Sequence, residues 1–428
     1  MEKTNENDKK ALRELAKRYR EISEKEEMGI RKQLWRDLHD LKPKRPMILF
    51  EPFSLEIFLS DYKFKCTDPE LKNVENRMMC MIRQHEQLDD DLVVEPYFRI
   101  GWWGRDMIAS SNKYGDVVIE EHGAAKPSMA YISNFPIKTP DDIKKLTPRN
   151  FKIDREPSLG LKSRLEDIFG DILPVKLGNF DNFVSTNGDQ PFTGNNFIGI
   201  TWVLFKLIGA QNMMLWSYDH PDAIHKLCRF LADDRISFYK FMLDEHLLDF
   251  NSDNQFAGPS SYGYVSELTQ VGTEKKIELK DLWVWPESQE SQSFSPSMFN
   301  EFFLPYIAEI ANMFGLSYYG CCENITDRFE YIEKAIHNLR TVSVSGWSDN
   351  SKAGEFFGKK YVFSKKPFPA YVSTETPNWD LVKKEAEETA KATKNGCVEI
   401  IFRDAYSKNV TMERASEWIS IWRKAMGI

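Results

Sequence analysis

Two adjacent cysteines and a glutamate, Cys321, Cys322 and Glu323, stand directly after a short apolar stretch. That stretch, Leu316 to Gly320, reads as a buried strand, so the three side chains would lie at its carboxyl end. Thiolates and carboxylates are both ligands that zinc accepts, and a catalytic zinc keeps one coordination position open. We therefore expect a metal site that includes at least one of the two cysteines.

The same two cysteines also fit a simpler role. Free cysteines often pack in protein cores as small apolar residues. Side chains alternate along a strand, so regular geometry would turn only one of Cys321 and Cys322 toward a site. The sequence leaves open which of them that would be.

Chemically capable residues follow five consecutive predicted strands, at 281–286, 316–320, 339–345, 361–364 and 396–402. The carboxyl ends of parallel strands meet at one face of a barrel, where active sites lie. The residues that we select there are Glu287 and Gln289, then Cys321, Cys322 and Glu323, then Ser345 and Trp347, then Lys366, and finally Arg403 and Asp404.

These candidates have different expected roles. Lys366 and Arg403 could hold a carboxylate or phosphate of a substrate, or could balance the nearby acids. The acids Glu287 and Glu323 are further candidate zinc ligands. Aromatic walls could come from Trp347 and from a glycine-flanked pair earlier in the chain, although such tryptophans also serve as rim packing. That pair is Trp102 and Trp103.

The order of the predicted elements indicates the fold. Five strand–helix units in a row favour a parallel sheet with helices outside. With earlier strands near residues 47, 92 and 174, the total is about eight, which predicts a (β/α)8 barrel over residues 46–428. An open doubly wound sheet is the alternative, but no glycine-rich phosphate loop follows a strand. Residues 1–45 are charged with a helical stripe, which predicts an N-terminal helical extension on the barrel or on a second subunit of a homodimer.

Composition excludes several classes of protein. The chain has 428 residues, 42% of them hydrophobic, and a net charge of −8. The negative charge argues against nucleic-acid binding. No apolar run is long enough to span a membrane, and the charged start lacks a secretory signal. Six cysteines in a chain this long do not form a disulfide framework, so we expect a cytoplasmic protein.

Three tracts resemble the uroporphyrinogen decarboxylase superfamily: Gly315 to Asn324, Ser295 to Tyr306, and Arg340 to Ser345. The likeness covers roughly residues 46 to 428 and is strongest after Glu287. The resemblance implies a single (β/α)8 barrel. It also implies one of two activities, porphyrin decarboxylation or zinc-dependent methyl transfer involving a corrinoid.

The chain departs from both branches of that superfamily. It lacks the Met-Arg-Gln-Ala-Gly-Arg type of motif found in the porphyrin decarboxylases. The coenzyme M methyltransferases carry His-x-Cys after the corresponding strand and a second cysteine after the last strand. Laid on this sequence, that motif places Cys322 on the zinc cysteine and Gly320 on the histidine, while Arg403 and Asp404 replace the second cysteine. Carboxylates would have to complete the ligand set.

We therefore predict a zinc-dependent methyltransferase. It would move a methyl group from a small methoxy or methylamine compound to a corrinoid carried on a partner protein. A Lewis acid on the heteroatom would offset the poor leaving group. The alternatives are a cofactor-free decarboxylase, in which Arg403 and Lys366 hold carboxylates, and a non-catalytic binding protein on the same fold.

Overall fold

The computed structural model describes residues 5–51, 56–102, 113–123, 131–178, 196–405, 407 and 409–428. Its largest sheet has six strands: β1 (Met47–Phe50), β10 (Trp283–Val284), β11 (Leu316–Tyr319), β12 (Leu339–Val344), β13 (Val362–Lys365) and β14 (Cys397–Phe402). Neighbours pair in parallel in the order β1, β14, β13, β12, β11, β10. The first strand therefore lies beside the last, as in a sheet that curls toward closure.

Two further parallel strands form a separate pair, β2 (Phe98–Gly101) with β7 (Val175–Gly178). One isolated parallel bridge, between Phe197 and Trp285, extends the β10 edge of the large sheet. Within the described residues no strand pairing joins the two sheets. Seven of the eight predicted strands are thus present, six of them in an open, curled half-barrel, and the described residues do not form a closed barrel. The strand expected near residue 92 begins later, at Phe98, because residues 91–95 are irregular.

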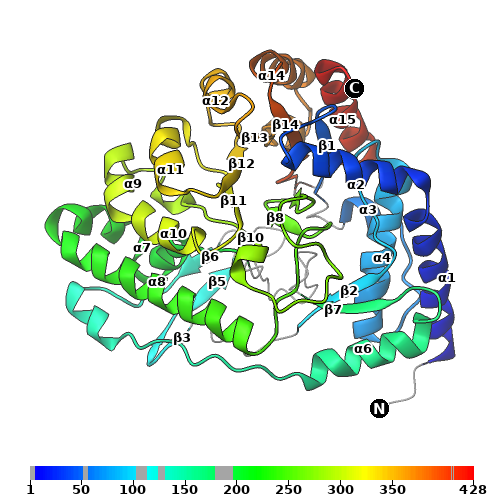
Figure 1. Cartoon of the computed structure of the whole chain (residues 1–428), viewed down its shortest axis with the longest axis horizontal. Coiled ribbons are helices and arrows are strands. Elements are labelled where there is room, and N and C mark those ends of the chain that lie inside the picture. The colour runs from blue at the N-terminus through cyan, green and yellow to red at the C-terminus, as the bar shows by residue number, and fades with distance from the viewer. Residues whose placement is uncertain are drawn as a thin grey trace.

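Helices follow most of these strands and cover the outside of the sheet (Figure 1). The first half of the chain contains α1 (Glu6–Ser23), α2 (Glu26–His39), α3 (Glu56–Leu59), α4 (Pro69–Gln87), α6 (Glu156–Phe169), α7 (Ile200–Asp219) and α8 (Pro221–Asp244). The second half contains α9 (Pro296–Phe302), α10 (Leu304–Ala311), α11 (Phe329–Ala335), α12 (Asn350–Phe357), α13 (Ala370–Ser373), α14 (Trp379–Ala392) and α15 (Met412–Met426). None of the described helices has the length and apolar character needed to cross a membrane.

Short polar side chains begin several of these helices. The Asp68 carboxylate accepts the Leu71 N–H at the start of α4, and the Thr411 hydroxyl accepts the Arg414 N–H at the start of α15. Each cap satisfies a backbone donor that the first helical turn leaves without a partner. The remaining elements are four 3-10 turns, η2 (Pro140–Lys145), η3 (Leu279–Asp281), η4 (Gln289–Ser291) and η5 (Thr326–Arg328).

Three small antiparallel pairs complete the described structure: β3 (Lys113–Tyr114) with β4 (Val117–Val118), β5 (Glu121–Gly123) with β6 (Tyr131–Ser133), and β8 (Phe256–Gly258) with β9 (Ser261–Tyr262). The β8–β9 hairpin packs directly on the large sheet, because a Cβ at Gly258 would lie 2.1 Å from the ring of Tyr318 in β11. Glycine is therefore required there by close approach.

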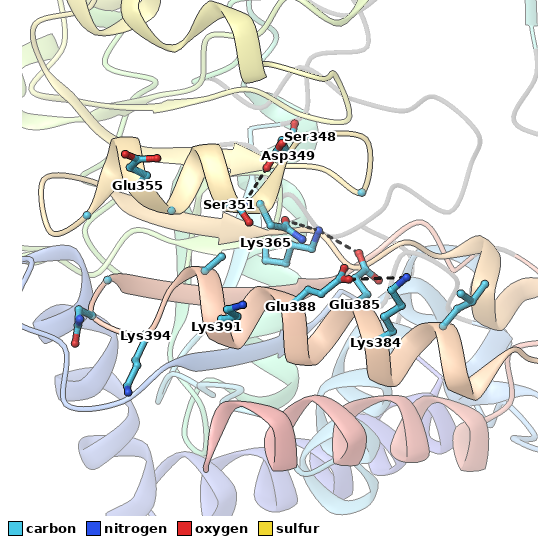
Figure 2. A pocket seen from close by; sticks show the side chains of 18 of the residues that line it. Ser348, Asp349, Ser351, Glu355, Lys365, Lys384, Glu385, Glu388, Lys391 and Lys394 are labelled. Atoms are coloured by element: carbon cyan, nitrogen blue, oxygen red, sulfur yellow. Dashed lines mark hydrogen bonds and ion pairs between the residues drawn. The ribbon is translucent and has the colours of Figure 1, made fainter.

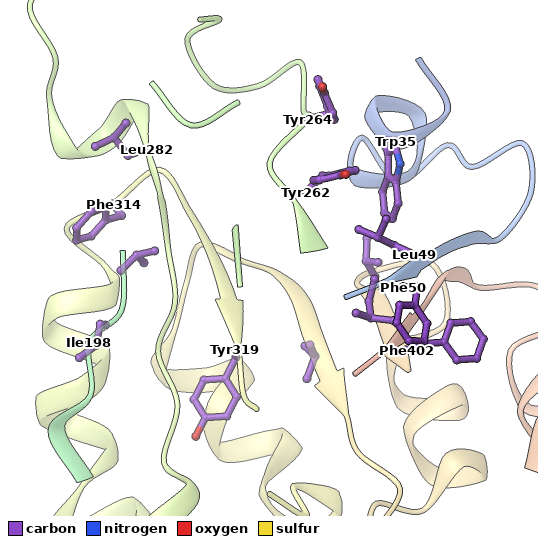
Figure 3. Close-up of a cluster of buried hydrophobic side chains, with 14 of the residues drawn as sticks. Trp35, Leu49, Phe50, Ile198, Tyr262, Tyr264, Leu282, Phe314, Tyr319 and Phe402 are labelled. Carbon is purple, nitrogen blue, oxygen red and sulfur yellow. The ribbon is translucent and has the colours of Figure 1, made fainter. Parts of the chain in front are cut away.

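The N-terminal helices belong to the main hydrophobic core. The predicted stripe of α1 is buried, including Leu12, Leu15 and Tyr19. Trp35 of α2 is fully buried, donates its indole N–H to the Asp91 carbonyl at 2.9 Å, and contacts the ring of Tyr262. Figure 3 shows Trp35, Leu49, Phe50 and Phe402 grouped beside Tyr262. The helical extension thus shares one core with the first and last strands.

This shared core gives a prediction about stability. Trp35→Ala should lower the free energy of unfolding by about 3–5 kcal/mol, because it opens a large cavity and leaves the Asp91 carbonyl without its donor. Urea unfolding followed by circular dichroism would measure the change. On the same helix, Ile30 is 54% exposed, so Ile30→Ala should change stability by no more than about 0.5 kcal/mol. Equal effects of the two substitutions would show that α2 is not part of the cooperative core.

Candidate active site

The two adjacent cysteines lie side by side on a turn that follows β11. Gly320 ends the strand with φ +96°, a conformation that glycine adopts readily. The alternation of a regular strand therefore stops before Cys321, and both cysteines are half-buried with their sulfur atoms 3.6 Å apart. The expectation that only one of them faces the site applies to regular strand geometry, which ends at Gly320.

Glu323 holds this turn in place. One carboxylate oxygen accepts the N–H of Cys321 at 2.8 Å, and the other accepts the N–H of Ser288 at 3.2 Å. The Ser345 hydroxyl donates to the Glu323 carbonyl at 3.0 Å. Burial raises the pKa of Glu323, although these backbone donors oppose the shift. Both oxygens are thus already used to position the cysteines, and Ser345 supports the same turn.

The end of β14 brings a second set of charges to the cysteines. The Cys322 thiol donates to Asp404 at 3.5 Å, and the Arg403 guanidinium lies 3.8 Å from the Cys321 sulfur. Arg403 also pairs with Glu51, at the end of β1, with 3.0 Å between nitrogen and oxygen. Asp404 has φ +61°, an unfavourable conformation for a residue other than glycine. Backbone strain of this kind often occurs at functional sites.

The electrostatics of this cluster differ from residue to residue. Burial would lower the pKa of Arg403, but Glu51 and Asp404 outweigh it and hold that pKa well above its usual range. The hydrogen bond between the two thiols and burial raise the pKa of Cys321 well above that of a free thiol. In this arrangement Arg403 is a fixed cation, and Cys321 is mostly protonated at neutral pH.

Lys366 lies deeper, at the end of β13. Its ammonium donates to the hydroxyls of Tyr318 at 2.7 Å and Ser364 at 2.6 Å. Burial lowers the pKa of Lys366 to about 8, with Glu399 opposing the shift. Glu399 in turn lies 3.7 Å from His39 of α2. A buried polar network therefore runs from the N-terminal extension through the sheet interior to Lys366.

Glu287 and Glu290 form a third, purely acidic part of the site. Glu287 is 3% exposed. One of its oxygens accepts the Gln289 N–H at 2.8 Å, and the other, Oε1, is buried with no hydrogen-bond partner among the described residues. Burial and the neighbouring Glu290 raise the pKa of Glu287 well above its ordinary value. Burial also raises the pKa of Glu290 to about 7, although the Thr201 hydroxyl, which donates to it at 2.7 Å, opposes the shift.

The remaining predicted residues are placed less centrally. The Gln289 side chain is exposed, and Trp347 is 65% exposed with its ring against Phe368. Trp102 is half-buried and packs against the hydrophobic core. Trp103 lies outside the described residues. Among the described residues, neither Trp102 nor Trp347 has a hydrogen bond or ring contact with the cysteines or with Glu287.

Sequence reasoning missed several buried groups in this region. Glu399 carries a detectable signal, because it interrupts the apolar run of β14 between Val398 and Ile400. Glu51 directly follows β1, just as the selected residues follow later strands, so its position could have been recognised. Glu290 follows the same predicted strand as Glu287 and Gln289, but its pairing with Thr201 had no local signal, since that pairing depends on how α7 packs against η4.

The donor set around Cys322 has the chemistry of a zinc site but is incomplete. Zn–S bonds of about 2.3 Å and Zn–O bonds of about 2.0 Å give tetrahedral edges of about 3.7 Å for sulfur–sulfur and about 3.5 Å for sulfur–oxygen. The distances from Cys322 to Cys321 and to Asp404, 3.6 and 3.5 Å, match these edges. In the part of the chain that the structure describes, however, no group of three His, Cys, Asp or Glu side chains is arranged to hold a metal ion.

The most prominent pocket lies elsewhere (Figure 2). It has a volume of about 880 Å³ and lies outside the sheet, between α12 and α14. Lys365 is buried at its base and contacts Asn350 and Glu385, each at 3.1 Å. None of the predicted site residues lines it. Because both signs of charge line this pocket and Lys365 already has partners, we assign the chemistry to the strand ends instead.

Comparisons with known proteins bear on the fold. No protein-family model matches the chain, and no curated sequence matches it. Among solved structures, the chain is similar to a methyltransferase from Methanosarcina mazei, with a TM-score of 0.53 and 12% sequence identity. The match covers 92% of this chain and 97% of that one. At this identity the similarity concerns the overall fold, which therefore extends over nearly the whole length of both proteins.

The thiol pair gives a prediction about reactivity. In metal-free protein, Cys322→Ala removes the hydrogen bond that most raises the pKa of Cys321, while Arg403 remains. The thiolate is the reactive form, so alkylation of Cys321 by iodoacetamide at pH 8 should become faster than in the wild type. Peptide mass spectrometry would follow it, because the other four cysteines are buried. Cys66→Ala is the control and should not change the rate, whereas an unchanged or slower rate in Cys322→Ala would contradict the assignment.

Proposed function

We propose that this protein is a methyltransferase that takes a methyl group from a small methylated compound at the strand-end site and passes it to a corrinoid protein. The observation that carries the proposal is the pairing of Cys322 with both Cys321 and Asp404 at distances that suit a soft metal ion. The similarity in fold to a structure named methyltransferase supports it. The resemblance in the cysteine tract supports it as well.

Zinc suits the donor types of Cys322, Asp404 and Cys321, and Cys322 with Asp404 or Cys321 would hold it together with further ligands. When bound there, it would supply a Lewis acid that polarises the heteroatom carrying the methyl group. Binding requires that Cys322 lose its proton. The Cys322 thiol donates its proton to Asp404 Oδ2 in a hydrogen bond, so that proton would be displaced to solvent when both groups hold zinc.

Other residues of the chain keep this arrangement in position. Glu323 fixes the cysteine turn through the N–H groups of Cys321 and Ser288. Arg403 places a positive charge next to the Cys321 sulfur and is itself held by Glu51. We propose that Arg403 and Glu323 are positioning residues, and that the substrate enters on the side of Glu287.

The alternative of a decarboxylase has less support. It needs Arg403 and Lys366 to hold substrate carboxylates. Arg403 is already paired with Glu51, and Lys366 already donates to Tyr318 and Ser364. Few cations therefore remain for a polycarboxylated substrate.

Metal content tests the zinc part of the proposal. Protein purified without chelators should contain about one zinc per chain by elemental mass spectrometry. Cys322→Ala and Asp404→Ala should each lose it. Cys66→Ala is the matched control, since this buried cysteine lies away from the site, and it should keep the metal. Wild-type protein without zinc after zinc has been supplied would exclude the metal mechanism.

Methyl transfer is tested separately. The wild type should convert a cobalt(I) corrinoid protein to its methylated form in the presence of a methylated donor, which changes the absorbance of the cobalt. Cys322→Ala should reduce the rate by at least about 100-fold, in the range expected when metal-based activation is lost. Zinc content without methyl transfer from any methoxy or methylamine compound would favour a non-catalytic binding protein.

A further inference from the structure

The acidic part of the site has a buried oxygen atom without a partner. Glu287 is 3% exposed, and its Oε1 has no hydrogen-bond partner among the described residues. The charged neighbours that act most strongly on it are the acids Glu290 and Glu323. A buried carboxylate without a donor or a counter-ion costs several kcal/mol. The free protein therefore lacks a positive group at this position.

The cations nearest to this acidic region act on Glu290 and Glu323, and their contacts in the described structure lie away from Glu287. Arg328 donates to the Ser291 hydroxyl and to the carbonyls of Ser291 and Phe294. Lys206 pairs with Glu121 and lies over the ring of Trp202. Neither forms an ion pair with Glu287 in the described structure. In the free protein a proton neutralises Glu287, and a cationic ligand would replace that proton with its own positive charge.

Aromatic rings lie on the segment that carries Glu287 and on the neighbouring segment around Phe197. Trp285 precedes Glu287 by two residues, and its indole N–H donates to the Gly320 carbonyl at 2.9 Å. The ring of Phe197 lies 4.7 Å from that of Trp285, and Trp202 lies 6.0 Å from Phe197. These three rings form a continuous aromatic group beside the start of the cysteine turn.

Hydrogen bonds fix the aromatic group relative to the acids. The backbones of Ile198 and Trp285 are bonded at 3.0 Å, and the Thr201 hydroxyl donates to Glu290 at 2.7 Å. The Lys206 ammonium lies 3.2 Å from the centre of the Trp202 ring. One ring of this group therefore already accepts a cation, as expected for an electron-rich aromatic face.

We propose that the site binds a methylated ammonium cation, with its charged head between the Glu287 carboxylate and the aromatic faces of Trp285 and Phe197. Aromatic rings combined with a carboxylate suit quaternary ammonium groups, which have no N–H to donate. A neutral methoxy compound would leave the Glu287 carboxylate without a counter-ion. This inference rests on the methyl-transfer part of the proposed function and not on its zinc part, and it narrows the methyl donor to the ammonium class.

The chemistry of such a donor is consistent with methyl transfer. The C–N bond breaks with its electron pair returning to nitrogen, so a quaternary ammonium ion leaves as a neutral tertiary amine. The methyl group goes to the nucleophilic acceptor, cobalt(I) in the proposed reaction. Because the nitrogen already carries the positive charge, this step needs no proton and no metal on the nitrogen. The inference is therefore independent of the zinc part of the proposed function.

A pair of isosteres tests the charge directly. Choline and 3,3-dimethylbutan-1-ol have nearly the same shape, but only choline carries the positive charge. Titration calorimetry with the full-length protein, in the presence of a chelator and without any methyl acceptor, should show that choline binds at least about 10-fold more tightly. Equal affinity for the two compounds, or no binding of either, would overturn the proposal.

Variants assign the binding to these residues. Glu287→Gln keeps the shape and removes the charge, so it should weaken choline binding at least about 10-fold and leave the neutral alcohol unaffected. Trp285→Leu should weaken choline by a similar factor. Glu309→Gln, at an exposed carboxylate paired with Arg229, is the matched control and should bind choline like the wild type. An unchanged affinity in Glu287→Gln would also overturn the proposal.

The same experiment separates this inference from the proposed function. Choline that binds through Glu287 but transfers no methyl group to any corrinoid protein would overturn the methyltransferase and leave the ammonium site in place. The protein could instead transfer methyl groups from methoxy compounds and bind choline no more tightly than its isostere. That outcome would overturn the ammonium site and leave the methyltransferase in place. If Glu287→Gln fails to fold, the comparison of the two isosteres in the wild type still decides.

Discussion

The structure of the strand-end site depends on one buried cation, Arg403. Its guanidinium pairs with Glu51 at 3.0 Å and lies 3.8 Å from the Cys321 sulfur. Those partners end β1 and follow β11, whereas Arg403 follows β14, so one side chain ties together three strand ends. Removing one partner of a buried ion pair leaves an uncompensated charge and is strongly destabilising. The position of the cysteine turn is therefore coupled to the pairing of the first strand with the last.

The polar interior divides into two parts with different charge balance. On the side of β13 and β14, the cations Arg403 and Lys366 face the acids Glu51 and Glu399. On the side of β10 and η4, burial raises the pKa of Glu287 and of Glu290. Lys206 opposes this shift at Glu290, whereas the charged groups that act most strongly on Glu287 are acids. The cysteines lie between the two parts. A substrate with a positive charge would be attracted to the acidic side and held next to Cys322.

Much of the fold could be predicted from sequence, because alternating strand and helix patterns after Asp281 are regular and local. The strands β10, β11, β12 and β14 lie within the predicted segments, and β13 runs one residue past its segment, to Lys365. The candidates selected after these five strands do follow them. Closure of the barrel could not be predicted in this way, since it depends on pairings between β2, β7 and the rest of the sheet. The position of β2 also could not be predicted from the hydrophobic pattern. Residues 91–95 are as apolar as a strand but are irregular in the structure.

The roles of individual site residues were harder to predict than their positions, and the reason is physical. Glu323 follows a strand as a ligand would, yet both of its oxygens accept backbone N–H groups, which only the fold of the turn reveals. Glu287 has the same residue type and a similar position, yet one of its oxygens lacks a described partner. A carboxylate that already accepts two hydrogen bonds is satisfied, whereas one with a buried and unpaired oxygen favours a proton or a cation. The hydrogen bonds that each carboxylate accepts therefore distinguish their roles, although their places in the sequence are similar. Glu323 holds the turn of the site, and Glu287 is the residue proposed to bind the ligand.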